Sequence, residues 1–129
     1  MKQAFKHPQI FADVLTLMQL YYPLHQSLPR PFRFAVGELI LQELAQMQRH
    51  IVLANAVDKT QASGRASGAG HVRRVRAGVE VVRGYMLLAW KLRMLAHMPL
   101  ADLSARLEAI ARQACRWQQW FEGGAAPSV

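Results

Sequence analysis

The stretch that decides the fold spans residues 72–96 and reads VRRVRAGVEVVRGYMLLAWKLRMLA. Its first half alternates basic residues with valines at helical spacing. Its second half, from Tyr85 onward, is apolar on almost every side of a helix. A helix that is apolar all round must be buried all round. The stretch therefore predicts a helix with a core on one side, a second protein surface on another, and an acidic partner near its arginines.

Composition and charge limit the classes of protein to which the chain can belong. With 129 residues, 52% of them hydrophobic, it can build one domain with a real core and is not an extended disordered tail. Sixteen Lys and Arg against eight Asp and Glu give a net charge of +8, which favours an acidic partner. An inert basic surface is the alternative. Cys115 is the single cysteine, so no internal disulfide is expected and a reducing compartment is favoured.

Four helices are predicted from apolar residues spaced three and four positions apart, over residues 9–28, 33–56, 71–97 and 99–122. Pro23 predicts a kink or a break in the first helix, and the kink is favoured because the pattern resumes after it. The Gly- and Ser-rich residues 58–70 predict a flexible loop, residues 1–8 a frayed lead-in and residues 123–129 a disordered tail. The fold predicted is an all-α, antiparallel up-down four-helix bundle.

Chemistry typical of enzymes is not visible in the sequence. The five histidines do not stand at metal-ligand spacing, and no carboxylate pair or phosphate-binding glycine loop is present. His25 lies on the apolar seam of the first helix, where a satisfied core or interface histidine is expected, and Cys115 is expected to be a buried, inert thiol. We predict no catalytic residues, no metal site and no cofactor. The lack of a leader peptide or membrane span predicts a cytoplasmic protein that binds no membrane.

Basic residues are concentrated in the second half of the chain and are the candidate site for nucleic acid or an acidic protein. The nine candidates are Arg73, Arg74, Arg76, Arg83, Lys91, Arg93, Arg106, Arg112 and Arg116. The planar fork of arginine suits phosphate and carboxylate groups. A solvated helix face is the alternative, but between Gly70 and Arg116 only Glu80, Asp102 and Glu108 are present to balance these cations. Binding is therefore favoured over a face covered with salt bridges.

Surplus apolar residues predict self-association. A four-helix monomer cannot bury every side of the helix from Tyr85 onward, and aromatic residues are favoured at the centres of interfaces. The predicted interface residues are Tyr85, Leu87, Leu88, Trp90, Leu92, Leu95, Trp117 and Trp120.

Residues 22–30, YPLHQSLPR, open into the long second helix and carry a resemblance to a known family. Together with the basic and apolar third helix and Trp120, this segment resembles the accessory variability determinant (Avd) family of diversity-generating retroelements. The resemblance covers residues 10–121 and implies a non-catalytic four-helix bundle that forms a pentameric, ring-like homo-oligomer. It further implies binding of a reverse transcriptase and of RNA, and also of DNA, in support of mutagenic cDNA synthesis and retrohoming. The long loop 58–70 and the absence of a polar cap before the fourth helix depart from the family pattern.

Two other interpretations remain open. The chain can be a four-helix-bundle protein of the ribosomal RNA intervening-sequence type, with another nucleic-acid or protein partner. It can also be an enzyme with a site inside the bundle, which would have to involve His25 and Tyr21.

Overall fold

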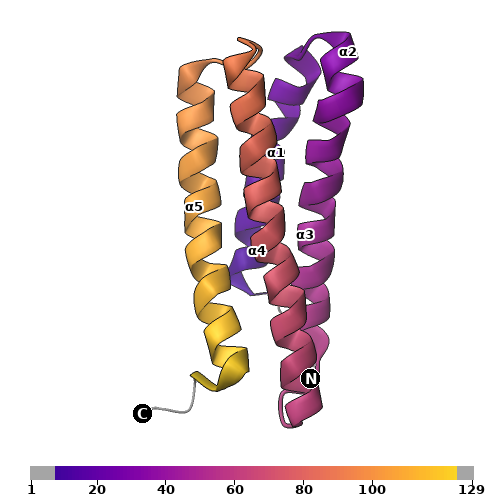
Figure 1. Cartoon of the computed structure of the whole chain (residues 1–129), viewed down its shortest axis with the longest axis vertical. Helices are drawn as coiled ribbons and strands as arrows, with labels where there is room; N and C mark the ends of the chain where they lie inside the picture. The colour runs from indigo at the N-terminus through magenta and orange to yellow at the C-terminus, as the bar shows by residue number, and fades with distance from the viewer. Residues whose placement is uncertain (1–7, 125–129) are drawn as a thin grey trace, which may run out of the picture.

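The computed structural model describes residues 8–124 and is all-helical over that range. Four long helices, α1 (Gln9–Ser27), α3 (Glu38–Ala56), α4 (Ala62–Lys91) and α5 (His97–Gln119), make up the molecule (Figure 1). The short α2 (Arg30–Phe32) and a π-helical turn, η1 (Arg33–Gly37), lead into α3, and a second π-type segment, η2 (Trp120–Gly124), follows α5. The predicted lead-in, apart from Pro8, and all but the first two residues of the predicted tail lie outside the described residues.

The first helix runs through its proline. α1 continues from Gln9 to Ser27 with Pro23 inside it, so the alternative of a break at this proline is wrong. The buried face of α1 is centred on Ile10, Val14, Leu17 and Tyr21, while Phe11 and Met18 are only half-buried.

The second predicted helix is confirmed and begins slightly earlier than expected. Helical structure starts at Arg30, with Pro31 in the first turn, where a missing backbone N–H costs nothing. It continues through η1 and α3 to Ala56. The predicted apolar seam of this helix is buried throughout, from Gly37 to Ala54.

The prediction of a flexible loop over residues 58–70 is wrong, because α4 already begins at Ala62. Asp58 accepts hydrogen bonds from the backbone N–H and the hydroxyl of Thr60, at 3.0 and 2.6 Å, and so forms the short turn between α3 and α4. Gly68 is buried in the first third of α4, where a Cβ would stand 2.4 Å from Cε1 of Phe121. The small residues that suggested a loop thus serve close packing of a helix.

The third and fourth predicted helices are confirmed, but both predicted starts and the end of the third are displaced. α4 ends at Lys91 and not near residue 97, because Arg93 takes a left-handed backbone conformation (φ 63°) in the turn that follows. α5 begins at His97, two residues before the prediction, and it has no side-chain cap, as expected from Ala96. Gly123, at φ 98°, ends the helical segment after α5.

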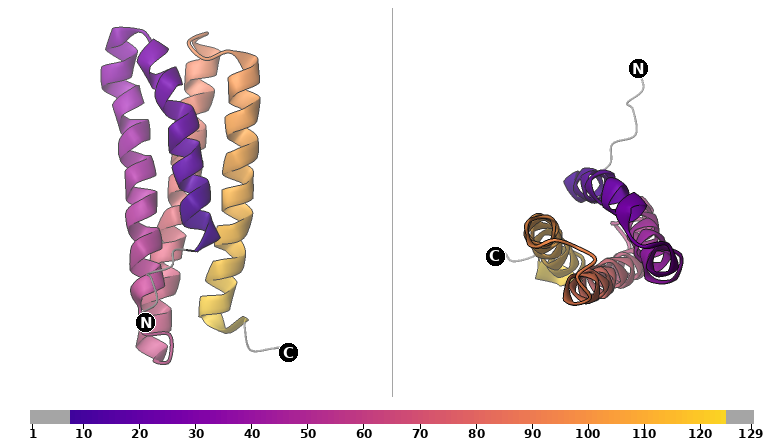
Figure 2. Two further views of the ribbon diagram at one scale, coloured as in Figure 1. Left: turned by 180° about the vertical axis from the view of Figure 1, so that it is seen from behind. Right: turned by 90° about the horizontal axis from the view of Figure 1, so that it is seen from above.

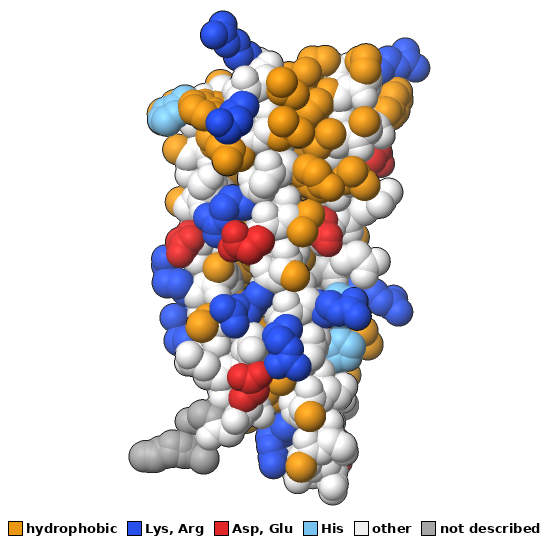
Figure 3. Space-filling model, viewed as in Figure 1, with side chains coloured by type: hydrophobic (Ala, Val, Ile, Leu, Met, Phe, Trp, Pro, Cys, Tyr) orange, Lys and Arg blue, Asp and Glu red, His pale blue; other side chains and the backbone are white. Residues whose placement is uncertain are grey.

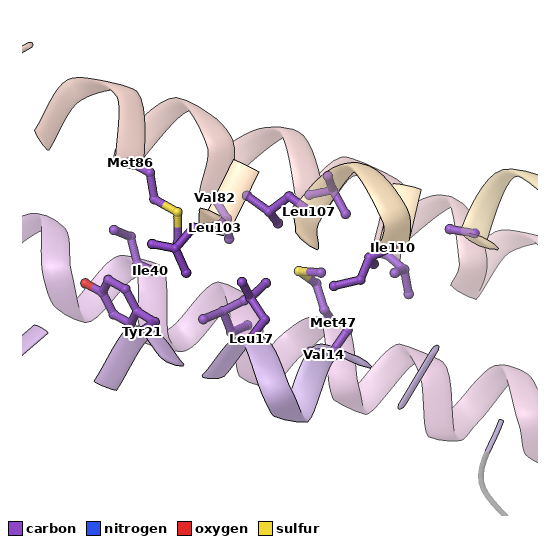
Figure 4. Close-up of a cluster of buried hydrophobic side chains, with 14 of the residues drawn as sticks. Val14, Leu17, Tyr21, Ile40, Met47, Val82, Met86, Leu103, Leu107 and Ile110 are labelled. Atoms are coloured by element: carbon purple, nitrogen blue, oxygen red, sulfur yellow. The ribbon is translucent and has the colours of Figure 1, made fainter. Parts of the chain in front are cut away.

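The core lies between the four long helices. α3 packs on α4, α4 on α5, and α1 on both α3 and α5, so that the helices enclose one interior (Figure 2). Side chains from all four helices meet there; examples are Leu17, Met47, Val82 and Leu107, each exposed by no more than 1% (Figure 4). Among residues 8–124, none of the helices is both long enough and apolar enough to cross a membrane.

Candidate nucleic-acid interface

Three of the predicted arginines on α4 turn toward α5 and are already engaged there. Arg73 forms an ion pair with Glu122 at 2.6 Å, and Arg76 donates a hydrogen bond to the side-chain oxygen of Gln118 at 2.8 Å. Arg83 lies 3.3 Å from a carboxylate oxygen of Glu108 and also contacts Glu80. Their spacing along α4 places them in one row, and this row is a seam between two helices of the same chain.

Two predicted arginines of α5 are paired within their own helix. Arg106 lies 3.4 Å from Asp102, and Arg112 lies 4.0 Å from Glu108. The expectation that too few acids were present to pair with the basic residues is therefore wrong for four of the nine: Arg73, Arg83, Arg106 and Arg112. Such pairs between exposed side chains contribute only about 0.2–1 kcal/mol each and break easily, so they reduce but do not remove the capacity to bind phosphate.

The remaining predicted cations have no ion-pair partner within the described part of the chain. They are Arg74, Lys91, Arg93 and Arg116, and all four are exposed. Lys91 and Arg93 lie at the end of α4 and in the turn after it, whereas Arg74 lies on the side of α4 that faces α3. The nine candidates therefore do not form one continuous site.

A cluster on α3 and α4 brings together residues that the sequence analysis did not connect. Nδ1 of His50, on α3, lies 2.9 Å from Nδ1 of His71, on α4, with the ring centroids 5.2 Å apart. The charges of Arg49 and Arg74 act on His50 of this pair. We call these four residues, Arg49, His50, His71 and Arg74, the His–Arg cluster. The two histidines are 21 positions apart, so only the packing of α3 on α4 reveals their contact.

The electrostatics of the His–Arg cluster are those of an uncompensated positive site. Partial burial and the charges of His71, Arg74 and Arg49 lower the pKa of His50 below its ordinary value of 6.5. An open pocket of about 330 Å³ adjoins the cluster, lined by His50 and Arg74 and, toward its other end, by Glu43 and Val81. His50 is thus favoured in its neutral form near pH 7, and an anion beside it would favour its protonation.

A second polar group, at His25, is buried and internally satisfied. His25 is 3% exposed, its Nδ1 lies 3.2 Å from the hydroxyl of Tyr21, and its Nε2 lies 3.3 Å from Glu38. Burial and the nearby Glu38 carboxylate raise the pKa of Tyr21, so its phenol stays protonated. The prediction of a satisfied core histidine is confirmed, and the group links α1 to the start of α3.

The predicted interface residues separate into two classes. Five are exposed, each by between 38% and 50%: Leu87, Leu88, Trp90, Leu92 and Trp120. Tyr85 and Trp117 are half-buried against the core. Leu95 is only 7% exposed, so its assignment to the interface is wrong; the early end of α4 folds it back into the core.

Apolar exposure continues beyond the predicted residues. Leu39 of α3 and Val81 of α4 are also exposed, by 42% and 41%, and both line one pocket between these helices. Figure 3 shows a patch of hydrophobic side chains over the end of α4 and toward α3, with most Lys and Arg of this face below it. Neither Leu39 nor Val81 is among the predicted interface residues, so this extension of the patch is revealed only by the structure.

Groups with other chemistry are sparse in the part of the chain that the structure describes. No three His, Cys, Asp or Glu side chains among residues 8–124 are arranged to hold a metal ion. Cys115, expected to be buried, is partly accessible and lies 3.8 Å from the side-chain nitrogen of Gln119.

Comparisons with protein-family models, with curated proteins and with solved structures found no match for this chain.

Proposed function

We propose that this chain is a non-catalytic accessory protein of the Avd type, which binds the reverse transcriptase of a diversity-generating retroelement together with its template RNA, and also binds DNA. The protein would support mutagenic cDNA synthesis and retrohoming by holding polymerase and template together. The observation that carries the proposal is that unpaired cations and large exposed apolar side chains occur together on α3 and α4.

The cationic part suits nucleic-acid backbone. Arg49 and Arg74 are exposed, and neither has a carboxylate partner in the described structure. Arginine forks bind phosphate oxygens through paired hydrogen bonds, and contacts of this kind give affinity without reading base sequence. Arg116, Lys91 and Arg93 offer further cations on other parts of the surface for the polymerase or for a longer RNA.

The apolar part suits contact with further copies of the chain. We infer an antiparallel up-down bundle that assembles into a ring-like homo-oligomer, most simply a pentamer. A closed ring needs two different, complementary surfaces on each protomer. α4 offers them on its two sides: Leu88 follows Val81 and Tyr85 at helical spacing toward α3, whereas Leu87 follows Arg83 toward α5.

Binding of template RNA as a function of salt tests the proposal. If about four phosphates are contacted, the logarithm of the association constant should fall with the logarithm of salt concentration with a slope of about −3 for single-stranded RNA. Co-purification with any reverse transcriptase that is encoded beside this gene is the second arm. Binding of RNA without the polymerase would favour a protein of the intervening-sequence type, and binding of neither at low salt would refute the proposal.

A further inference from the structure

We propose that the His–Arg cluster is a phosphate site whose affinity for the RNA backbone rises as the pH falls. This inference rests on the proposed binding of RNA and adds to it a specific site and a dependence on protons. The site is formed by Arg49 and His50 of α3 and by His71 and Arg74 of α4.

The geometry of the histidine pair makes it responsive to an anion. At 2.9 Å, one Nδ1 donates a hydrogen bond and the other accepts it, so the pair holds at least one neutral ring. A phosphate oxygen is an acceptor only and competes for N–H donors. When both rings are protonated they repel each other, and a phosphate that accepts a hydrogen bond from each relieves that repulsion.

The surroundings favour an anion over a metal ion. A cation bound by the two histidines would lie close to Arg49 and Arg74, and no third His, Cys, Asp or Glu ligand accompanies the pair within residues 8–124. The arginines instead supply donors for the same phosphate from both helices. Both arginine side chains are exposed, so an extended polyanion can reach them.

The carboxylates near the histidine pair are too few to cancel the positive charge of the site. Glu43 of α3 lies two helical turns from His50 and lines the far part of the adjoining pocket. Asp13 of α1, which also packs on α3, accepts a hydrogen bond from Gln113 and is directed to the contact with α5. On α4, Arg73 is turned away toward Glu122. Glu43 is therefore the one described carboxylate that shares the pocket, and it should weaken anion binding there.

Proton linkage determines whether binding strengthens or weakens as the pH falls, and over which pH range it does so. Without a ligand, the pKa of His50 lies below 6.5 because of burial and its cationic neighbours. A bound phosphate favours the protonated form of the pair and raises the pKa of His50, so binding takes up protons and strengthens as the pH falls from above 7 toward 5.5. If binding shifts the protonation of the pair by one pKa unit in total, the affinity gain approaches about tenfold at the low end of this window.

Fluorescence anisotropy with a mixed-sequence single-stranded RNA, at pH 7.5 and 5.5 and constant ionic strength, tests the inference. The unaltered protein should bind about ten times more tightly at pH 5.5, and the double variant His50→Gln/His71→Gln should lose most of that gain. His97→Gln, at an exposed histidine at the start of α5, is the matched control and should keep the gain. Glu43→Gln should strengthen binding at both pH values.

Histidine NMR titrations with inorganic phosphate test the phosphate site independently of the proposed RNA binding. Phosphate should raise the apparent pKa of His50 and shift the ring resonances of His71, and it should leave the ring resonances of His97 unchanged. If the phosphate effect is present and RNA does not bind, the site stands and the proposed RNA-binding function fails. If RNA binds and the double histidine variant keeps the full pH-dependent gain, or if phosphate leaves both titrations unchanged, the inference is overturned.

Discussion

Gly68 of α4 lies directly against the ring of Phe121, which follows α5. A Cβ on Gly68 would stand 2.4 Å from Cε1 and 2.5 Å from Cζ of that ring, and Phe121 is only 3% exposed. The contact attaches the beginning of α4 to the C-terminal turn of the bundle. It is the reason that a Gly- and Ser-rich segment forms an ordered helix.

Gly68→Ala should therefore destabilise the protein, although alanine is the better helix former. Forcing a methyl group against the buried ring should lower the free energy of unfolding by about 1–3 kcal/mol. Gly84 lies in the same helix with open space around its α-carbon, so Gly84→Ala should raise the free energy of unfolding by about 0.5–1 kcal/mol. Urea unfolding followed by circular dichroism measures both, and equal effects of the two substitutions would contradict the packing described for Gly68.

Stability should decrease in acid because of the histidine pair. The pKa of His50 is lowered in the folded protein, so the unfolded chain binds the proton more tightly. The corresponding stability is present above pH 6.5 and is lost as the pH falls through the folded-state pKa of His50. The melting temperature of the unaltered protein should fall between pH 7 and pH 5 at low phosphate, and less so in His50→Gln. A parallel fall in both proteins would place the acid sensitivity elsewhere.

Removal of the Tyr21 hydroxyl should destabilise the protein more than removal of the Tyr22 hydroxyl. Tyr21→Phe leaves Nδ1 of the buried His25 without its partner, which should lower the free energy of unfolding by about 1–3 kcal/mol. Tyr22 is 54% exposed and stacks on the same imidazole through its ring, so Tyr22→Phe should change stability by less than about 0.5 kcal/mol. Denaturant midpoints of the two variants decide the point, and similar costs would argue against the buried link at His25.

Glutamate substitutions should separate assembly from folding. Leu88 is 38% exposed, so Leu88→Glu should dissociate the oligomer and leave the helical content intact, and Trp90→Glu should do the same. Leu95→Glu should instead unfold the protomer, because Leu95 is 7% exposed and a carboxylate cannot be buried there unpaired. Light scattering should give 73 kDa for the unaltered protein, five times 14.6 kDa. A mass of 14.6 kDa at micromolar concentration would refute the proposed assembly.

Periodicity predicted the helices well where one apolar face decides burial. The residues spaced three and four positions apart from Gly37 to Ala54 are buried, and so are Val75, Val79, Val82 and Met86 of α4. The prediction failed at residues 62–70, because small residues such as Gly and Ser are typical both of a flexible loop and of a tightly packed helix. The end of α4 was misplaced because leucine and methionine favour a helix, whereas the left-handed backbone at Arg93 has no sequence signal.

The candidate site could be predicted only in part from the sequence. The excess of arginine was visible, but the pairing of Arg73 with Glu122 depends on how α4 packs on α5. The contact between His50 and His71 likewise depends on the register of α3 on α4, which no local spacing encodes. Arg49 is a candidate only because it adjoins His50 in that contact.

Co-purification of template RNA and reverse transcriptase with this protein, compared between the unaltered chain and Arg49→Gln/Arg74→Gln, tests the central claim most directly. Arg106→Gln/Arg112→Gln is the control, because it removes the same charge from arginines that already pair with Asp102 and Glu108. The account predicts that the unaltered protein retains RNA and polymerase and that Arg49→Gln/Arg74→Gln loses about 90% or more of the RNA, as expected when two phosphate contacts of about 1 kcal/mol each are removed. The control should lose much less, because its arginines are already ion-paired. Equal retention of RNA by all three proteins, or by none of them at low salt, would contradict it.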